Sequence, residues 1–244
     1  MRSAGVFVAL FGLVSTSLAQ PPVQSPTSNR EIIERGCRGP EVTTGPEREQ
    51  LDRIEKRLRG AIKPDGKHRI HVALTRVRMI NAWEEPVDST RYLVCVPVAM
   101  VHFMGEAEGE LAFVVSHEIG HALDDLCRTA RGRLAVARSQ GSLGAALGEI
   151  IGGESGAYKY STLAQQKGCE ERADEIGFMI FTKAGYNPFD AAGSFGRLAM
   201  YSGDTGTGLI GYLKALGSDH PMTPERIAHM RTLLVRQIRE SSQP

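Results

Sequence analysis

Hydrophobic residues recur at the spacing of a helix over residues 110–126. The apolar positions are three or four residues apart and share one face: Leu111, Val114, Val115, Ile119, Ala122 and Leu126. Similar spacing, with proline or glycine near the ends, predicts further helices at residues 46–60, 168–183 and 188–201, and from about residue 223 onwards. The chain is therefore expected to be rich in amphipathic helices.

Shorter runs of β-branched and apolar residues predict strands at Ile70–Leu74, Val77–Ile80 and Tyr92–Met100. Pro97 indicates an edge strand or a break in the last run, since proline has no N–H for a sheet interior. Residues 81–83 are a candidate start of an edge strand that pairs with substrate backbone, although their tryptophan fits an ordinary core equally well. The expected architecture is a small mixed sheet packed on several helices, an α+β fold.

The helix expected at residues 110–126 contains the motif H-E-x-x-H, in which His117 and His121 are four residues apart. Residues at this spacing share one helix face, so both imidazoles can bind one zinc ion. Glu118 is turned about 100° from His117, where it can reach a metal-activated water without being a ligand. The motif also occurs by chance, but its place on an amphipathic helix favours a catalytic zinc site, which needs a third protein ligand.

Two carboxylates in the next predicted helix are candidates to complete this site. Glu170 and Asp174 are four residues apart and share a face. Glu170 can complete a His, His, Glu zinc set, and Asp174 can accept the second ring N–H of a zinc-bound histidine. The alternative is a solvated acidic helix start, because carboxylates favour the first turn of a helix. Alongside H-E-x-x-H, the metal interpretation is favoured.

These elements resemble those of the HtpX-like, CAAX prenyl protease-type zinc metallopeptidases, in which H-E-x-x-H precedes a helix bearing E-x-x-A-D. The second element is Glu170-Glu171-Arg172-Ala173-Asp174 in this chain. Further similar stretches follow the family's order from about residue 47 to 235: Asn81-Ala82-Trp83, Gly109-Glu110-Leu111-Ala112, Asp219-His220-Pro221 and Glu225-Arg226-Ile227. The resemblance implies a zincin-like domain with H-E-x-x-H on its active-site helix.

The resemblance also implies roles for individual side chains. His117, His121 and Glu170 would bind one Zn²⁺ per chain. Glu118 would be the general base, and Asp174 would support a ligand.

Two residues further along the chain have less specific roles under the same resemblance. His220 would lie near the metal, either aiding the oxyanion or acting as a gating ligand, unless it is a surface loop histidine. Arg226 would orient the segment that contains His220, unless Arg226 is an exposed helix residue. This chain lacks the histidine that family members often carry shortly after the zinc helix, and many members are membrane-embedded.

The N-terminus has the pattern of an export signal. A positive start, an apolar run at residues 5–14 and a small-x-small sequence ending at Ala19 are typical of a cleaved signal peptide. The run is too short to span a bilayer comfortably, so we expect an exported protein, periplasmic or secreted, with no stable membrane insertion after cleavage. The expected organisation is a signal peptide at 1–19, a flexible segment at 20–46 and a zinc metallopeptidase domain at 47–240.

The chain has four cysteines, Cys37, Cys95, Cys127 and Cys169. An even count in an exported chain favours disulfides, and four cysteines allow three pairings. We favour Cys127 with Cys169, which would connect the end of the zinc helix to the start of the Glu170 helix, and Cys37 with Cys95. The competing interpretation makes Cys169 a zinc ligand or a redox switch.

The composition of the 244 residues is that of a globular protein, with 41% hydrophobic and 23% charged residues. The net charge of +1 gives no indication of nucleic acid as a partner, and the oligomeric state stays open. The favoured function is zinc-dependent endoproteolysis of exported or envelope proteins, such as protein quality control. The alternative is a latent or non-catalytic, zinc-containing, chaperone-like module that binds peptides.

Overall fold

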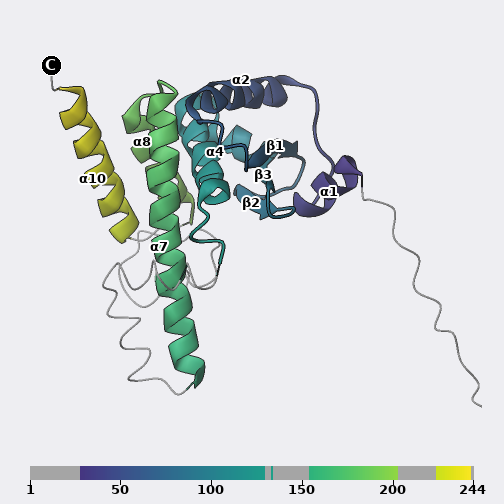
Figure 1. Cartoon of the computed structure of the whole chain (residues 1–244). Helices are drawn as coiled ribbons and strands as arrows, with labels where there is room; N and C mark the ends of the chain where they lie inside the picture. The colour runs from purple at the N-terminus through teal and green to yellow at the C-terminus, as the bar shows by residue number, and fades with distance from the viewer. Residues whose placement is uncertain (1–27, 130–132, 134–153, 203–223, 243–244) are drawn as a thin grey trace, which may run out of the picture.

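The computed structural model describes residues 28–129, 133, 154–202 and 224–242. Ordered along the chain, its elements are α1 (Asn29–Gly36), α2 (Pro46–Ala61), β1 (Arg69–Thr75), β2 (Trp83–Pro86), β3 (Arg91–Pro97), α3 (Val98–Met104), α4 (Glu108–Leu123), α7 (Glu154–Lys183), α8 (Pro188–Ser202) and α10 (Pro224–Ser241) (Figure 1). This mixture of helices with a small sheet is the α+β arrangement expected from the sequence.

The sheet has three strands in the order β1-β3-β2. β1 runs parallel to β3, and β2 runs antiparallel to it, so the sheet is mixed. Among the described strands, β2 is therefore an edge strand, and it begins at Trp83 as the sequence predicted. Trp83 is also 7% exposed and packs in the smaller of two cores, so its interpretation as a core residue is confirmed, whereas pairing of this strand with substrate stays a prediction.

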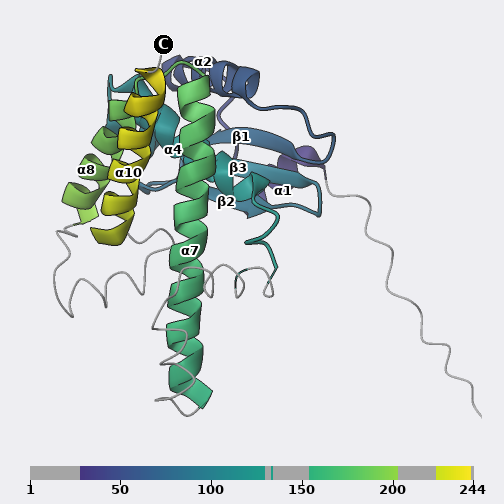
Figure 2. The ribbon, with the colours of Figure 1, turned by 60° about the vertical axis from the view of Figure 1, so that its left-hand side comes forward.

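The two faces of the sheet contact different helices because successive side chains of a strand point to opposite faces. Val72, Leu74, Val94 and Val96 join the main core with residues of α2, α4, α7, α8 and α10. Ala73, Leu93 and Cys95 face the other side, where α1 packs. Helix α4 lies between the sheet and the helices α7, α8 and α10 (Figure 2).

Helix α4 is apolar nearly all round, which fits its central place. Every residue from Leu111 to Gly120 is buried, including the polar side chains of Ser116, His117 and Glu118. A helix in this position brings any polar group it carries into the interior, where burial is costly unless the group is paired. The polar residues of α4 therefore mark a site rather than a solvated face.

Residues 28–45 differ from the flexible segment expected at 20–46. A capping box begins α1: the Ser28 side chain accepts from the Glu31 N–H at 3.3 Å, and the Glu31 carboxylate accepts from the Ser28 N–H at 2.9 Å. Cys37 is fully buried in a disulfide with Cys95 of β3. Proline and glycine in this segment thus separate short ordered pieces, and the expectation is wrong for residues 28–45.

Two strand predictions were wrong in detail. Residues 77–80 form no strand, because the chain turns away from β1 after Thr75 before it returns as β2. The run expected to reach Met100 ends as a strand at Pro97, which is the N-cap of α3. Proline has no N–H for the sheet but fits the residue that precedes a helix, so Pro97 is a break.

The remaining helix predictions agree with the structure except at two ends. Helix α4 ends at Leu123, so Leu126, which was expected on its apolar face, lies beyond the helix and is 41% exposed. Helix α7 begins at Glu154 rather than near Gly168, so Gly168 is an interior helix residue. Its C-terminal stop is at Gly185, which has φ of 79°. Within the described ranges, none of the helices has the length and apolar composition of a membrane span.

Candidate metal centre

Three side chains from two helices converge at the centre of the molecule. His117 and His121 lie on neighbouring turns of α4, and their Nε2 atoms are 3.1 Å apart. Glu170 of α7 reaches both rings: its carboxylate oxygens lie 3.3 Å from Nε2 of His117 and 3.2 Å from Nε2 of His121. The three predicted ligands are thus brought together from positions about 50 residues apart in the sequence.

These separations fit a single zinc ion. Zinc binds imidazole nitrogen and carboxylate oxygen at about 2.0–2.2 Å in a tetrahedron, whose corners are then about 3.3 Å apart. Donor atoms of the three side chains all lie within 4.8 Å of one another, and the nearest pairs are 3.1–3.3 Å apart. The chemistry of the set also suits zinc, since two imidazoles and one carboxylate form a three-ligand site with a corner left for water.

Asp174 orients His117. Its carboxylate lies 2.8 Å from Nδ1 of the His117 ring, one helical turn after Glu170 on the same face of α7. An Nδ1–H donated to this carboxylate leaves Nε2 with its lone pair toward Glu170 and His121. The alternative of a solvated acidic helix start is wrong, because Glu170 and Asp174 are only 4% and 0% exposed and lie in the interior of α7.

The local electrostatics favour positive charge at this place. Burial lowers the pKa of His117, but Asp174 and Glu170 outweigh this effect and raise it to about 10. Burial likewise raises the pKa of Asp174, yet Arg226 and His117 hold it below its usual value. Both shifts show that a cation beside these carboxylates is stabilised.

Arg226 of α10 joins the cluster from a third helix. Its guanidinium lies 2.9 Å from Glu170 and 2.7 Å from Asp174. Burial lowers the pKa of Arg226, but Asp174, Glu170 and Glu118 raise it, and the net shift is upward. Arg226 is 2% exposed, so the alternative of an exposed helix residue is wrong.

When both histidines are neutral, as metal ligands are, the buried charges of the described residues near them sum to a negative value. Glu118, Glu170 and Asp174 are at most 4% exposed, and Arg226 is the buried base beside them. Three carboxylates and one guanidinium have a formal charge of −2 among the described residues, when both histidines are neutral. A divalent cation restores neutrality, which an isolated buried charge requires.

Two glycines allow α4 and α7 to cross in backbone contact. A Cβ at Gly120 would lie 2.5 Å from the carbonyl oxygen of Ala173, and one at Gly177 would lie 2.8 Å from the carbonyl oxygen of Ser116. Any side chain at either position would separate the two backbones. This close crossing is what places Glu170 and Asp174 within reach of the histidines of α4.

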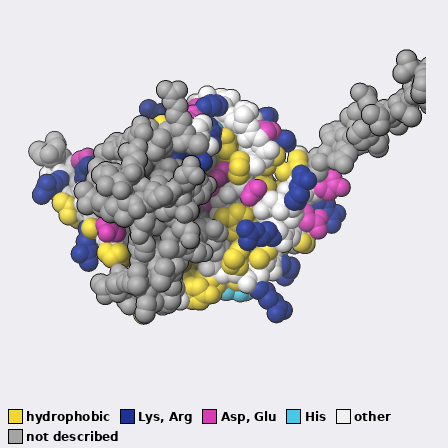
Figure 3. All heavy atoms as spheres, turned by 90° about the horizontal axis from the view of Figure 1, so that it is seen from below, with side chains coloured by type: hydrophobic (Ala, Val, Ile, Leu, Met, Phe, Trp, Pro, Cys, Tyr) yellow, Lys and Arg dark blue, Asp and Glu magenta, His cyan; other side chains and the backbone are white. Residues whose placement is uncertain are grey.

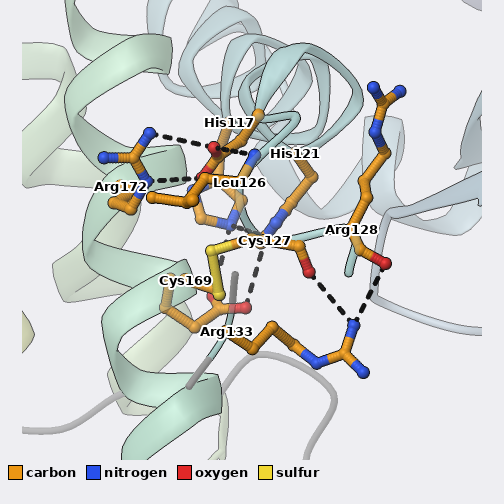
Figure 4. Close-up of a disulfide and its surroundings, with 10 residues drawn as sticks. His117, His121, Leu126, Cys127, Arg128, Arg133, Cys169 and Arg172 are labelled. Atoms are coloured by element: carbon orange, nitrogen blue, oxygen red, sulfur yellow. Dashed lines mark hydrogen bonds and ion pairs between the residues drawn. A yellow bond between two sulfur atoms is a disulfide. The ribbon is translucent and has the colours of Figure 1, made fainter. Parts of the chain in front are cut away.

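Both disulfides occur in the pairing favoured from the sequence, Cys37 with Cys95 and Cys127 with Cys169. The second joins the segment after α4 to the residue before Glu170, beside His121 (Figure 4). Cys169 is therefore committed to a disulfide, and the competing interpretation as a zinc ligand is not what the structure shows.

A pocket with a volume of about 490 Å³ opens beside His121. One wall comes from the edge strand and the turn that follows it, and the other comes from the segment after α4 and from the disulfide; the residues are Glu84, Pro86, Asp88, Ser89, Tyr92, His121, Cys127, Arg128, Arg133 and Cys169. The pocket thus connects an edge strand to a candidate metal ligand, as a site for an extended peptide requires.

One predicted site residue lies outside the described residues, and two residues beside the candidate ligands were not predicted. His220 lies outside the described residues, so its role stays a prediction. Asp124 and Arg172, which form an ion pair beside the ligands, belong to no motif. Arg172 lies within the E-x-x-A-D segment at a variable position, so only a close distance in space identifies the pair.

Comparison with known proteins gives one result for the whole of this region. The family model described as Peptidase family M48 matches residues 47–234. A search of curated proteins found no match. The matched range contains the three converging side chains together with Glu118, Asp174 and Arg226.

Proposed function

The chain belongs to peptidase family M48, and from this premise we propose that it is a zinc-dependent endopeptidase of exported proteins. The family is one of metallopeptidases, and a metal site is what the geometry supports. The single observation that carries the proposal is the convergence of His117, His121 and Glu170 with donor atoms 3.1–3.3 Å apart. We propose these three residues as the zinc ligands.

When bound, zinc polarises the scissile carbonyl and lowers the pKa of water at the site. Glu118 is the proposed general base. It is buried next to His117 in the sequence, and its charge acts on Arg226 at the centre of the cluster. Its carboxylate takes a proton from the attacking water and delivers it to the leaving amine.

Asp174 and Arg226 prepare the ligands for this role. Asp174 holds the Nδ1–H of His117, and Arg226 holds Glu170 and Asp174 in place. His220 remains the candidate donor to the oxyanion, or a ligand that gates the metal. Each role is a proposal that mutation can test separately.

The proposed substrates are extended segments of exported or envelope proteins, as in quality control. Edge strand β2 and the pocket beside His121 support binding of an extended chain. Two disulfides support an oxidising compartment, consistent with the export signal expected at residues 1–19. On the face shown in Figure 3, exposed hydrophobic side chains of the described residues lie between basic and acidic ones.

The alternative is a latent or non-catalytic module that uses the same cleft to bind peptides. The presence of Glu118 favours the enzyme, because a binding module has no need of a buried carboxylate in this motif. The two functions differ in one measurable respect, the dependence of substrate cleavage on Glu118.

The test compares the mature wild-type protein with Glu118→Gln and Glu106→Gln. Glu106 is exposed and undergoes the same chemical change outside the cluster. We expect one zinc per chain in all three proteins, cleavage of an unfolded casein substrate by the wild type and Glu106→Gln, and a loss of at least about 10²-fold in Glu118→Gln. Cleavage by Glu118→Gln at the wild-type rate would show that the base is misassigned. A zinc-loaded wild type without cleavage would favour the binding module.

A further inference from the structure

An ion pair outside the motifs connects the two helices that carry the proposed ligands. Asp124 is the C-cap of α4, three residues after His121, and Arg172 of α7 is two residues after Glu170. Nε and Nη2 of Arg172 donate to the two oxygens of Asp124 at 2.7 and 2.9 Å. This bidentate geometry is the strong form of an arginine–carboxylate pair.

The pair is built around a buried carboxylate. The side chain of Asp124 is 1% exposed, whereas that of Arg172 is 37% exposed. Figure 4 shows Arg172 reaching from α7 toward the end of α4, next to the Cys127–Cys169 disulfide. Without Arg172, the Asp124 carboxylate would lose its charged partner while remaining buried.

Asp124 also fixes the backbone of the turn that carries His121. Its own N–H donates to the carbonyls of Gly120 and His121 at 3.0 and 3.2 Å, and its side chain accepts from the N–H of Leu126 at 3.1 Å. The last turn of a helix is the part that frays most readily. Asp124 therefore links the end of α4 to α7 at the level of the ligands.

We propose that Asp124 and Arg172 are positioning residues for the metal site, which hold His121 at ligand distance from Glu170. The inference rests on the proposed function, because it assigns the pair to the zinc site. Other contacts act on other ligands: Asp174 orients His117, and Arg226 binds Glu170. The Cys127–Cys169 disulfide joins the same segments, but Cys127 is six residues after His121 and leaves the turn more freedom.

The experiment measures zinc affinity by competition with a chelator of known affinity, using zinc alone as the probe, at a temperature where every metal-free protein is folded. Arg172→Gln should weaken zinc binding about 10–100-fold, the range typical of residues that orient metal ligands. Arg172→Lys should restore part of the affinity, since lysine supplies the charge without the bidentate geometry. The double variant that combines Asp124→Asn with Arg172→Gln should lose no more zinc affinity than Asp124→Asn or Arg172→Gln alone, because the pair acts as a unit.

Lys183→Gln is the matched control. Lys183 is the last residue of α7. It donates to the carbonyl of Ala61 at 2.7 Å, and this contact between two helices is remote from the proposed ligands. Its loss should lower the unfolding temperature of the metal-free protein and leave zinc affinity unchanged.

Wild-type zinc affinity in both Arg172→Gln and Arg172→Lys would overturn the inference and leave the pair a purely structural contact. Because Arg172→Lys keeps the charge, it tests the inference even where Arg172→Gln does not fold. A wild type that binds no zinc would overturn the proposed function itself, and the two failures are therefore distinguishable.

Discussion

Several buried ionisable side chains among the described residues have partners of opposite charge. Arg48, 7% exposed, binds Asp52, Glu55 and the carbonyl of Val72. Asp124 and Arg172 pair in the same way. Such pairing is necessary because a single buried charge costs several kcal/mol, so each of these residues tolerates burial only together with its partner. At the candidate metal centre, a bound cation would complete the balance.

Asp190, in the first turn of α8, differs because its neighbour Glu110 has the same sign. Burial and Glu110 both raise the pKa of Asp190. An aspartate in an unfolded chain ionises at about pH 3.9. The pKa of Asp190 is higher in the folded state than in the unfolded state, so ionisation of Asp190 destabilises the folded protein. This destabilisation develops as the pH rises above about 4 and through the folded-state pKa.

We therefore expect Asp190→Asn to raise the thermal unfolding midpoint at pH 7. The gain over the wild type should shrink as the pH falls and should vanish below about pH 4, where Asp190 is protonated in both states. Unfolding midpoints of the two proteins between pH 3.5 and 8 measure this. A gain that is independent of pH would show that the charge of Asp190 is not its cause.

At the scale of elements, the crossing of α4 and α7 determines whether the site exists. H-E-x-x-H places two imidazoles on one helix face, but the third ligand comes from another helix that must approach to backbone contact. Gly120 and Gly177 permit that approach, and Ala173 presents only a methyl group and a carbonyl to it. Gly120 within the first motif and Gly177 shortly after the second are thus as necessary to the geometry as the candidate ligands.

Gly120→Ala tests this requirement. The new Cβ would lie 2.5 Å from the Ala173 carbonyl oxygen, which belongs to the backbone and can move only with α7. Overpacking of this kind costs about 1–3 kcal/mol, or roughly 2–12 °C in the unfolding midpoint of a protein of this size. Zinc affinity should fall as well, because Glu170 moves away from the histidines.

Gly196→Ala is the control for helix propensity. Gly196 is an exposed residue of α8, and a Cβ there meets nothing within 4 Å. Alanine should stabilise this helix by up to about 1 kcal/mol without changing zinc affinity. Equal effects of the two substitutions on unfolding and on zinc binding would contradict the importance of the close crossing.

Across the whole molecule, the metal centre is where distant parts of the chain meet. His117 and His121 come from the central helix, Glu170 and Asp174 from α7, and Arg226 from the C-terminal helix α10. An ion bound by His117, His121 and Glu170 would link α4 to α7 directly and α10 through Glu170. The ion should therefore stabilise the domain as a whole rather than one loop.

Removal of zinc from the mature protein should lower its unfolding midpoint. With free zinc at 1,000 times the dissociation constant, binding contributes about 4 kcal/mol, which corresponds to roughly 8–16 °C. Calorimetry before and after chelation measures the shift, and adding zinc back should restore the original midpoint. An unchanged midpoint after complete removal of the metal would contradict a site that joins these helices.

The sequence by itself determined the local features of this protein. The 3.6-residue period placed the histidines on one face of α4, and the proline and glycine positions marked most helix ends, because these properties depend only on neighbouring residues. The resemblance in E-x-x-A-D also indicated Glu170 as a third candidate ligand, and the structure brings it beside both histidines. The local pattern was less informative where tertiary packing decides the secondary structure. Residues 77–80 were expected to form a strand and do not, and residues 29–36 form α1 although no helix was expected there.

Only the tertiary structure decided how these local features meet. The sequence left the environment of Arg226 open and gave no sign that Asp124 pairs with Arg172, since each contact joins residues about 50 positions apart. The Asp124–Arg172 contact follows from the crossing of α4 and α7, where Gly120 and Gly177 fit against the opposite backbone, and the Arg226 contact follows from the packing of α10 on α7. Helical periodicity fixes the direction of a side chain within one helix, whereas its partner depends on the packing of the whole core.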